Sequence, residues 1–67
     1  MKRITFIVQE YGRLNSDGHP ILTNSYRTTR QGFTRTIAEM VRAGWRVSIE
    51  ENTRTGHFFY ARCYRPS

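Results

Sequence analysis

One segment in the middle of the chain repeats its apolar residues with the period of an α-helix, and the segments on either side do not. Four apolar residues at i, i+4, i+7 and i+8 form one helix face: Phe33, Ile37, Met40 and Val41. Thr28 and Gln31 have the spacing of a capping box. Gly44, directly after Ala43, suits the left-handed conformation that ends many helices. We therefore predict one helix from Thr28 to Ala43, regular from near Phe33 because Gly32 weakens its first turn by about 1 kcal/mol.

The flanking segments alternate apolar and polar residues, which is the pattern of half-buried β-strands. The expected strands are Lys2–Tyr11, Pro20–Arg27, Trp45–Glu50 and His57–Tyr64. Turn-forming residues at Asn15–Gly18 and Asn52–Gly56 separate the two members of each pair. The order β-β-α-β-β predicts a single α+β domain over residues 1–67, an antiparallel sheet with one helix packed on one face.

The helix should cover the apolar face of this sheet. The residues expected in the core are Ile4, Phe6, Val8, Val47 and Ile49, with Trp45 closing the edge. In the last strand, Phe59, Ala61 and Cys63 share one face, and their mostly small side chains suit packing under a helix. We expect Cys63 to behave as a small buried apolar residue.

A chain of this size has few ways to stabilise a small core. A domain of about 60 residues buries only about 60% of the surface that its unfolded chain exposes. The single Cys63 cannot form an internal disulfide, and His19 and His57 are not spaced as zinc ligands. Self-association remains, and we expect a homodimer as one possible assembly.

The charged residues indicate an anionic partner. Ten of the 11 basic residues are arginines, and the formal net charge is +6. A guanidinium group binds phosphate or carboxylate through two parallel hydrogen bonds and stacks on aromatic rings. The partner should therefore be nucleic acid or an acidic protein surface.

The last strand carries the candidate binding residues. Phe58, Tyr60, Arg62 and Tyr64 share the face opposite Ala61 and Cys63. Aromatic residues at i and i+2 beside arginines are suited to stacking on single-stranded bases. Alternate residues of the first strand could extend this surface: Arg3, Thr5, Ile7, Gln9 and Tyr11. Aromatic pairs also stabilise sheets without any binding role, and a dimer would bury the same face.

We therefore place the binding centre at Tyr60, Arg62 and Tyr64, beside Phe58. The flanking arginines are Arg3, Arg46, Arg54 and Arg65.

Nothing in the sequence indicates catalysis. His57 has no carboxylate at a telling spacing, and His19 lies in a turn. No phosphate-binding glycine loop, metal-ligand cluster or nucleophile motif is present. We expect a protein that is not an enzyme and uses no cofactor or metal.

The apolar stretches are all short. None approaches the roughly 18 residues of a membrane span, and the apolar part of Lys2–Val8 is shorter than a signal-peptide core. We expect a cytoplasmic protein, in the host cell cytoplasm if it is phage-encoded.

The whole chain resembles small accessory proteins of phages and mobile elements, such as anti-CRISPR proteins, in size and element order. The matching elements are an opening strand at Lys2–Val8, a helix at Thr34–Arg42, and a closing strand pair at Trp45–Glu50 and His57–Tyr64. The resemblance implies a protein that occupies surfaces of nucleic-acid-handling complexes and in some cases also contacts DNA.

Two functions are consistent with these features. The first is a phage-type inhibitor or adaptor that docks on a host protein or protein–nucleic acid complex. The alternative is a module that itself binds single-stranded nucleic acid or a duplex backbone. We favour the first, because the predicted helix mixes its arginines with polar residues and Glu39, whereas a DNA-reading helix is usually basic.

Overall fold

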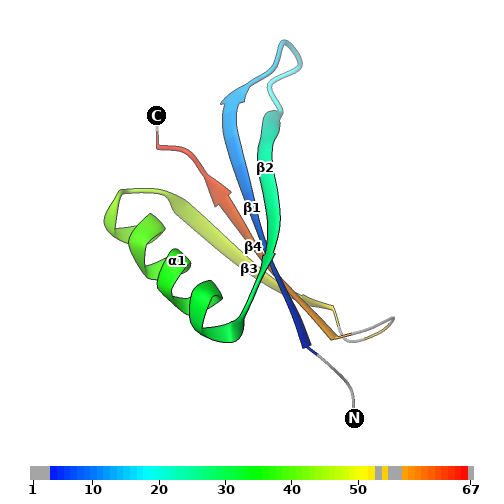
Figure 1. Ribbon diagram of the computed structural model, residues 1–67. Helices are drawn as coiled ribbons and strands as arrows, with labels where there is room; N and C mark the ends of the chain where they lie inside the picture. Colours follow the sequence, from blue (N-terminus) through cyan, green and yellow to red (C-terminus); the bar gives the residue numbers. More distant parts are fainter. Residues whose placement is uncertain (1–3, 53, 55–56, 67) are drawn as a thin grey trace.

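The computed structural model describes residues 4–52, 54 and 57–66. These residues form one α+β domain with the predicted element order (Figure 1). The elements are β1 (Ile4–Leu14), β2 (Pro20–Thr28), α1 (Arg30–Arg42), β3 (Arg46–Asn52) and β4 (His57–Tyr64). The predicted bounds of β4 are confirmed, whereas β1 extends further along the chain than expected. Lys2 and Arg3, together with most of the predicted Asn52–Gly56 turn, lie outside the described residues.

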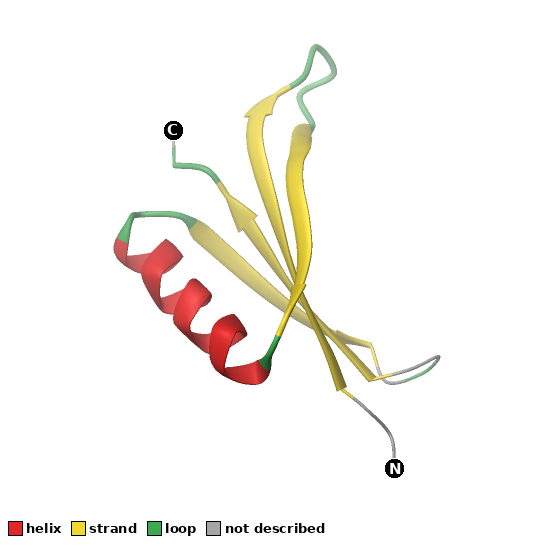
Figure 2. Ribbon diagram, viewed as in Figure 1, coloured by secondary structure: helices red, strands yellow, loops and turns green. Residues whose placement is uncertain are grey.

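The sheet is mixed, and the prediction of a fully antiparallel sheet was wrong. Its strand order is β2-β1-β4-β3. The pairs β1–β2 and β3–β4 are antiparallel, but the central pair β1–β4 is parallel. Parallel strands need a long crossover connection, usually containing a helix. Here α1 lies between the two hairpins and packs on one side of the sheet (Figure 2).

The core lies between α1 and the two central strands. Its buried residues are Phe6, Val8, Phe33, Ala61 and Cys63. The Phe6 ring lies 5.1 Å from that of Phe33 and 5.4 Å from that of Phe59, measured between centroids. The small side chains of Ala61 and Cys63 are fully buried beneath the helix, as predicted.

Around this core lie six partly buried apolar side chains. They are Tyr26, Ile37, Met40, Trp45, Val47 and Phe59. Five of these were expected to pack between helix and sheet, namely Ile37, Met40, Trp45, Val47 and Phe59, and that prediction is confirmed.

Three residues predicted in the core are exposed instead. The exposed fractions are 41% for Ile4, 54% for Ile49 and 57% for Val41. Helix length explains much of this result. A helix of 13 residues is about 20 Å long, whereas a strand of 11 residues reaches about 36 Å. Ile4 lies at the start of β1, and Ile49 lies on an edge strand, so neither is fully covered.

The helix begins one residue later than the predicted cap at Thr28 implies, but it is already regular before Phe33. Its N-cap is Thr29, whose hydroxyl accepts a hydrogen bond from the Gly32 backbone N–H at 3.0 Å. The N-cap was therefore predicted one residue too early, at Thr28. Gly32 lies in the first turn. The position favours glycine, because a Cβ there would collide with the Thr28 hydroxyl. Its missing side chain leaves room for β2 to pass directly into the helix.

Gly44 terminates the helix just after its last residue and its C-cap, as predicted. Gly44 has a φ of 91°, and its N–H donates to the Val41 carbonyl at 3.0 Å. The Trp45 N–H donates to the Met40 carbonyl at 2.9 Å. These two bonds form a Schellman motif. They place Trp45 and Met40 against the same core at the start of β3.

The β1–β2 hairpin projects beyond the helix (Figure 1). Its turn is organised by Asn15, whose Oδ1 accepts hydrogen bonds from the backbone N–H groups of Asp17 and His19 at 2.9 and 3.0 Å. Gly18 follows with a φ of 81°. In the described part of the chain, no helix has the length and apolar character needed to span a membrane.

The aromatic contact between helix and sheet should dominate the stability of the domain. Replacing Phe33 by alanine should lower the free energy of unfolding by about 3–5 kcal/mol, because it removes the buried ring of α1. Val41→Ala on the same helix is the matched control and should cost about 0.5 kcal/mol or less. Urea denaturation of both variants measures these values. Similar losses in the two variants would show that the helix packs through a different face.

Stability should also decline at alkaline pH. Burial raises the pKa of the Cys63 thiol, and Glu10 raises it further. Burial likewise raises the pKa of Tyr26. The unfolded chain therefore loses these protons first. The contribution of these two groups to the free energy of unfolding should be constant below about pH 8.5. It should fall above that pH, because the unfolded thiol titrates near that value.

Unfolding free energies measured from pH 7 to pH 11 test this expectation. The Cys63→Ala variant should move the onset of the decline toward about pH 10, where unfolded tyrosine titrates. A wild-type profile that stays flat to pH 10 would contradict this account of the thiol.

Candidate interaction surface on the open face of the sheet

The sheet face opposite α1 carries a paired array of side chains from the two central strands. The parallel register places Thr5 beside Phe58, Ile7 beside Tyr60, Gln9 beside Arg62 and Tyr11 beside Tyr64. We call these eight residues the open face. None of the described helical residues lies over it (Figure 2). The expectation that the described residues of the first strand would extend the aromatic surface of the last is therefore confirmed.

The aromatic rings of the open face pack against one another in pairs. Tyr11 and Tyr64 stack with centroids 5.1 Å apart and ring planes 18° apart. Phe58 and Tyr60 stack at 5.9 Å and 21°. All four residues are half-buried. Since near-parallel rings at these distances overlap, each ring already has part of one π-face covered by its neighbour.

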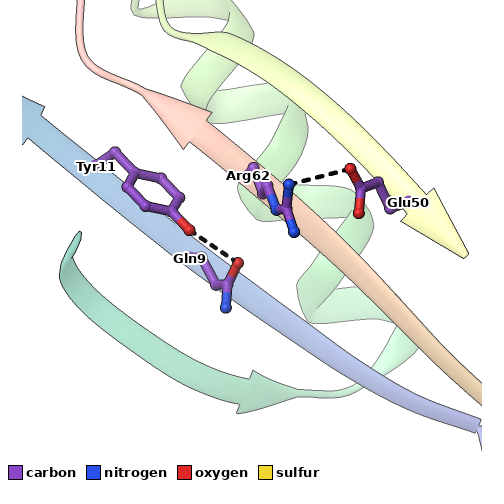
Figure 3. Close-up of polar contacts among 4 residues, drawn as sticks. All are labelled: Gln9, Tyr11, Glu50 and Arg62. Carbon is purple, nitrogen blue, oxygen red and sulfur yellow. Dashed lines mark hydrogen bonds and ion pairs between the residues drawn. The ribbon is translucent and has the colours of Figure 1, made fainter. Parts of the chain in front are cut away.

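A polar pair lies at the centre of the open face. The Arg62 guanidinium donates a hydrogen bond to the Glu50 carboxylate at 3.1 Å (Figure 3). The two side chains are 40% and 49% exposed, so the pair contributes only about 0–1 kcal/mol to stability. Nearby, the Tyr11 hydroxyl donates to Gln9 Oε1 at 3.3 Å. The Arg62 Nε is buried and has no hydrogen-bond partner within the described residues.

Glu50 was not assigned to Arg62 from the sequence. The antiparallel register places Ser48 opposite Arg62 and Glu50 opposite Tyr60, so Glu50 and Arg62 are diagonal neighbours on one face. Alternation places the even-numbered residues of both strands on one face of the sheet, which was the available signal. Their alignment depends on a turn whose geometry the sequence left open.

The flanking arginines do not form one cluster. Arg46 lies opposite Tyr64 on β3 and borders the open face. Arg54 follows β3 and is exposed, with its N–H donating to Asn52 Oδ1 at 3.2 Å. Arg65 follows β4, and its N–H donates to the Tyr11 carbonyl at 3.0 Å. Arg54 and Arg65 therefore lie at opposite ends of the sheet. Arg3 lies outside the described residues.

The sequence did not single out Arg27 as a binding residue. It lies opposite Ile7 on β2 and is exposed beside the open face. Arg27 and Tyr26 are neighbours on one strand and therefore lie on opposite faces of the sheet. The apolar pattern of the second strand was too weak to show which face each residue occupies.

Cys63 and the half-buried His57 belong to the strand face turned toward the helix. Within residues 4–52, 54 and 57–66, no three His, Cys, Asp or Glu side chains are grouped so as to hold a metal ion. The open face offers rings, one ion pair, an amide and hydroxyl groups.

Comparison with protein families, with curated proteins and with solved structures finds no significant match to this chain. The proposed function therefore rests on the fold and on the chemistry of the protein's surfaces.

The Arg62–Glu50 pair should be dispensable for folding. Glu50→Gln should change the free energy of unfolding by less than about 1 kcal/mol, because both side chains are well solvated. Glu39→Gln on α1 removes the same charge away from the open face and serves as the control. Urea denaturation measures both. A loss above 2 kcal/mol for Glu50→Gln alone would mean that the pair holds β3 against β4.

Proposed function

We propose that this chain is a non-enzymatic binding protein that docks through the open face onto a protein of a host nucleic-acid-handling complex. In this role it would act as a phage-type inhibitor or adaptor of the anti-CRISPR kind. The observation that carries the proposal is the open face itself: four half-buried aromatic rings and Ile7 surround a central arginine, and α1 covers the opposite side of the sheet.

The residue types of the open face favour a protein partner. Tyrosine and arginine are enriched among the residues that dominate binding energy at protein interfaces. Interface cores are also rich in aromatic residues and poor in unpaired charge. Arg62 fits this pattern because Glu50 already neutralises it in the free protein.

The same geometry is less suited to stacking on bases. A base needs a free ring face. Here each of the four rings packs on one face against its neighbour, which leaves a base only the outer faces of the pairs. The cations beside these rings are also few, since Arg62 is paired and Arg27 and Arg46 lie on the flanking strands.

The class of partner follows from charge and from the resemblance in element order. A net charge of +6 steers the chain toward acidic surfaces and toward complexes that hold nucleic acid. Small phage accessory proteins with this element order act on such complexes. We therefore propose a host protein or protein–nucleic acid complex as the partner.

Affinity purification from the native cell, with and without nuclease, should recover a protein whose association survives nuclease treatment. Tyr60→Ala should then weaken binding by about 30-fold or more, since truncating a central interface residue commonly costs about 2 kcal/mol. Arg35→Ala on α1 is the control and should change affinity by less than about threefold. Equal effects of the two variants, with both folded, would place the interface elsewhere.

Direct binding of nucleic acid is the alternative function, favoured by the arginines beside the aromatic strand. Salt dependence separates the two functions. Phosphate contacts make affinity fall steeply with salt, with a slope near −0.9 per phosphate on duplex DNA. Binding through the open face should respond much less, because its central arginine is already paired.

A second copy of the chain could also cover the open face, which is the predicted homodimer. Sedimentation at high micromolar concentration distinguishes these occupants. A monomer leaves the face available for a partner. A dimer that Tyr60→Ala dissociates would instead assign the face to self-association.

A further inference from the structure

A basic notch lies at the end of the sheet where β4 stops. β4 pairs with β1 only as far as Tyr11, but β1 continues to Leu14. Past that point the β1–β2 hairpin diverges from the rest of the sheet (Figure 1). A hollow results between the hairpin, the start of β3 and the residues after β4. Three segments line it: Gly12–Leu14 with Pro20, Gly44 with Arg46–Ser48, and Tyr64–Pro66.

Three arginines from three different segments line this notch. They are Arg13 from β1, Arg46 from β3 and Arg65 from the end of β4. All three are exposed, and the lining contains no aspartate or glutamate. Within the described part of the chain, the salt bridge is Arg62–Glu50, so these three guanidinium groups have no acidic partner there. The notch is therefore a concentrated site of positive charge.

The rest of the lining is apolar or lacks a side chain. Tyr64 lines the notch together with the arginines, and its ring stacks on that of Tyr11. Leu14, Pro20 and Pro66 add apolar surface on the hairpin side and at the end of the chain's described part. An anion site therefore adjoins a surface that suits a flat or apolar group.

We propose that this notch binds single-stranded nucleic acid, with successive backbone phosphates held by the three arginines and an adjoining base or sugar against Tyr64. A phosphate accepts paired hydrogen bonds from guanidinium groups. Each nucleotide also places a π-face next to its phosphate, which matches the combination of arginines and aromatic surface here. An acidic peptide supplies the anion, but its carboxylate side chains supply no such flat neighbour.

The notch adjoins the open face and shares Tyr64 with it, but the two differ in chemistry. The open face centres on Arg62, which is paired, whereas the notch lies beyond the last β1–β4 pair and holds arginines without acidic partners. The inference does not rest on the proposed protein docking. A Tyr60→Ala variant should retain the affinity of the notch for nucleic acid.

The test uses fluorescence anisotropy with a fluorescein-labelled oligothymidylate of 15 nucleotides. The double variant Arg13→Gln/Arg65→Gln should bind about tenfold or more weakly at low salt. Its salt slope should be shallower by about 1.4, which corresponds to two lost phosphate contacts on a single strand. The control Arg35→Gln/Arg42→Gln removes the same charge from α1 and should lose less than about threefold.

Two companion probes make the ligand class decidable. An abasic oligonucleotide of the same length should bind several-fold more weakly than oligothymidylate, because stacking on Tyr64 is lost. An oligoglutamate of matched charge should also bind more weakly. Equal losses in the two double variants would overturn the notch as a site. Equal affinity for oligoglutamate and oligothymidylate would assign the notch to an acidic peptide instead. Circular dichroism checks that each variant folds.

Discussion

The parallel pairing of β1 with β4 is the interaction on which the rest of this structure depends. It places the first and the last strand side by side at the centre of the sheet and leaves β2 and β3 as the edges. On one face, the pairing unites Phe6 and Val8 with Ala61 and Cys63 under the helix. On the other face, the same register aligns Tyr11 with Tyr64 and Gln9 with Arg62. Core and open face are thus two sides of one set of backbone hydrogen bonds.

The helix and its C-terminal end were predictable because local chemistry determines them. Gly44 ends the helix through its own conformational freedom, and the apolar stripe identifies Phe33 as a core residue. The parallel pairing was not predictable in the same way. Alternation indicates which residues share a face of a strand, but not which strand lies beside it. The predicted antiparallel sheet failed at that step, whereas the Arg62–Glu50 pair was missed because the register of the predicted β3–β4 hairpin depends on its turn.

Apolar character alone also overstated the core. Ile4, Val41 and Ile49 continue the expected patterns, yet each is more than 40% exposed. A single helix cannot cover strands that are longer than itself. The candidate residues of the last strand fared differently. Phe58, Tyr60, Arg62 and Tyr64 share one face as predicted, because they belong to one strand, whereas Arg54 and Arg65 lie at opposite ends of the sheet.

The arginines of this small domain consequently serve two kinds of surface. Arg62 is neutralised among aromatic rings, where desolvation on docking costs less for a pair that is already formed. The arginines of the notch keep their charge available to an anion. We propose that a protein partner binds the first surface and a nucleic acid strand the second. Such a division would suit a protein that acts on a complex containing both.

Chemical-shift mapping of the isotopically labelled chain, titrated with the protein recovered by affinity purification, tests the central proposal most directly. The account predicts that the largest amide shifts fall on the open face, at Ile7 and Gln9 of β1 and at Tyr60 and Arg62 of β4, with smaller changes along α1. Shifts concentrated on the solvent side of α1, with β1 and β4 unchanged, would contradict it.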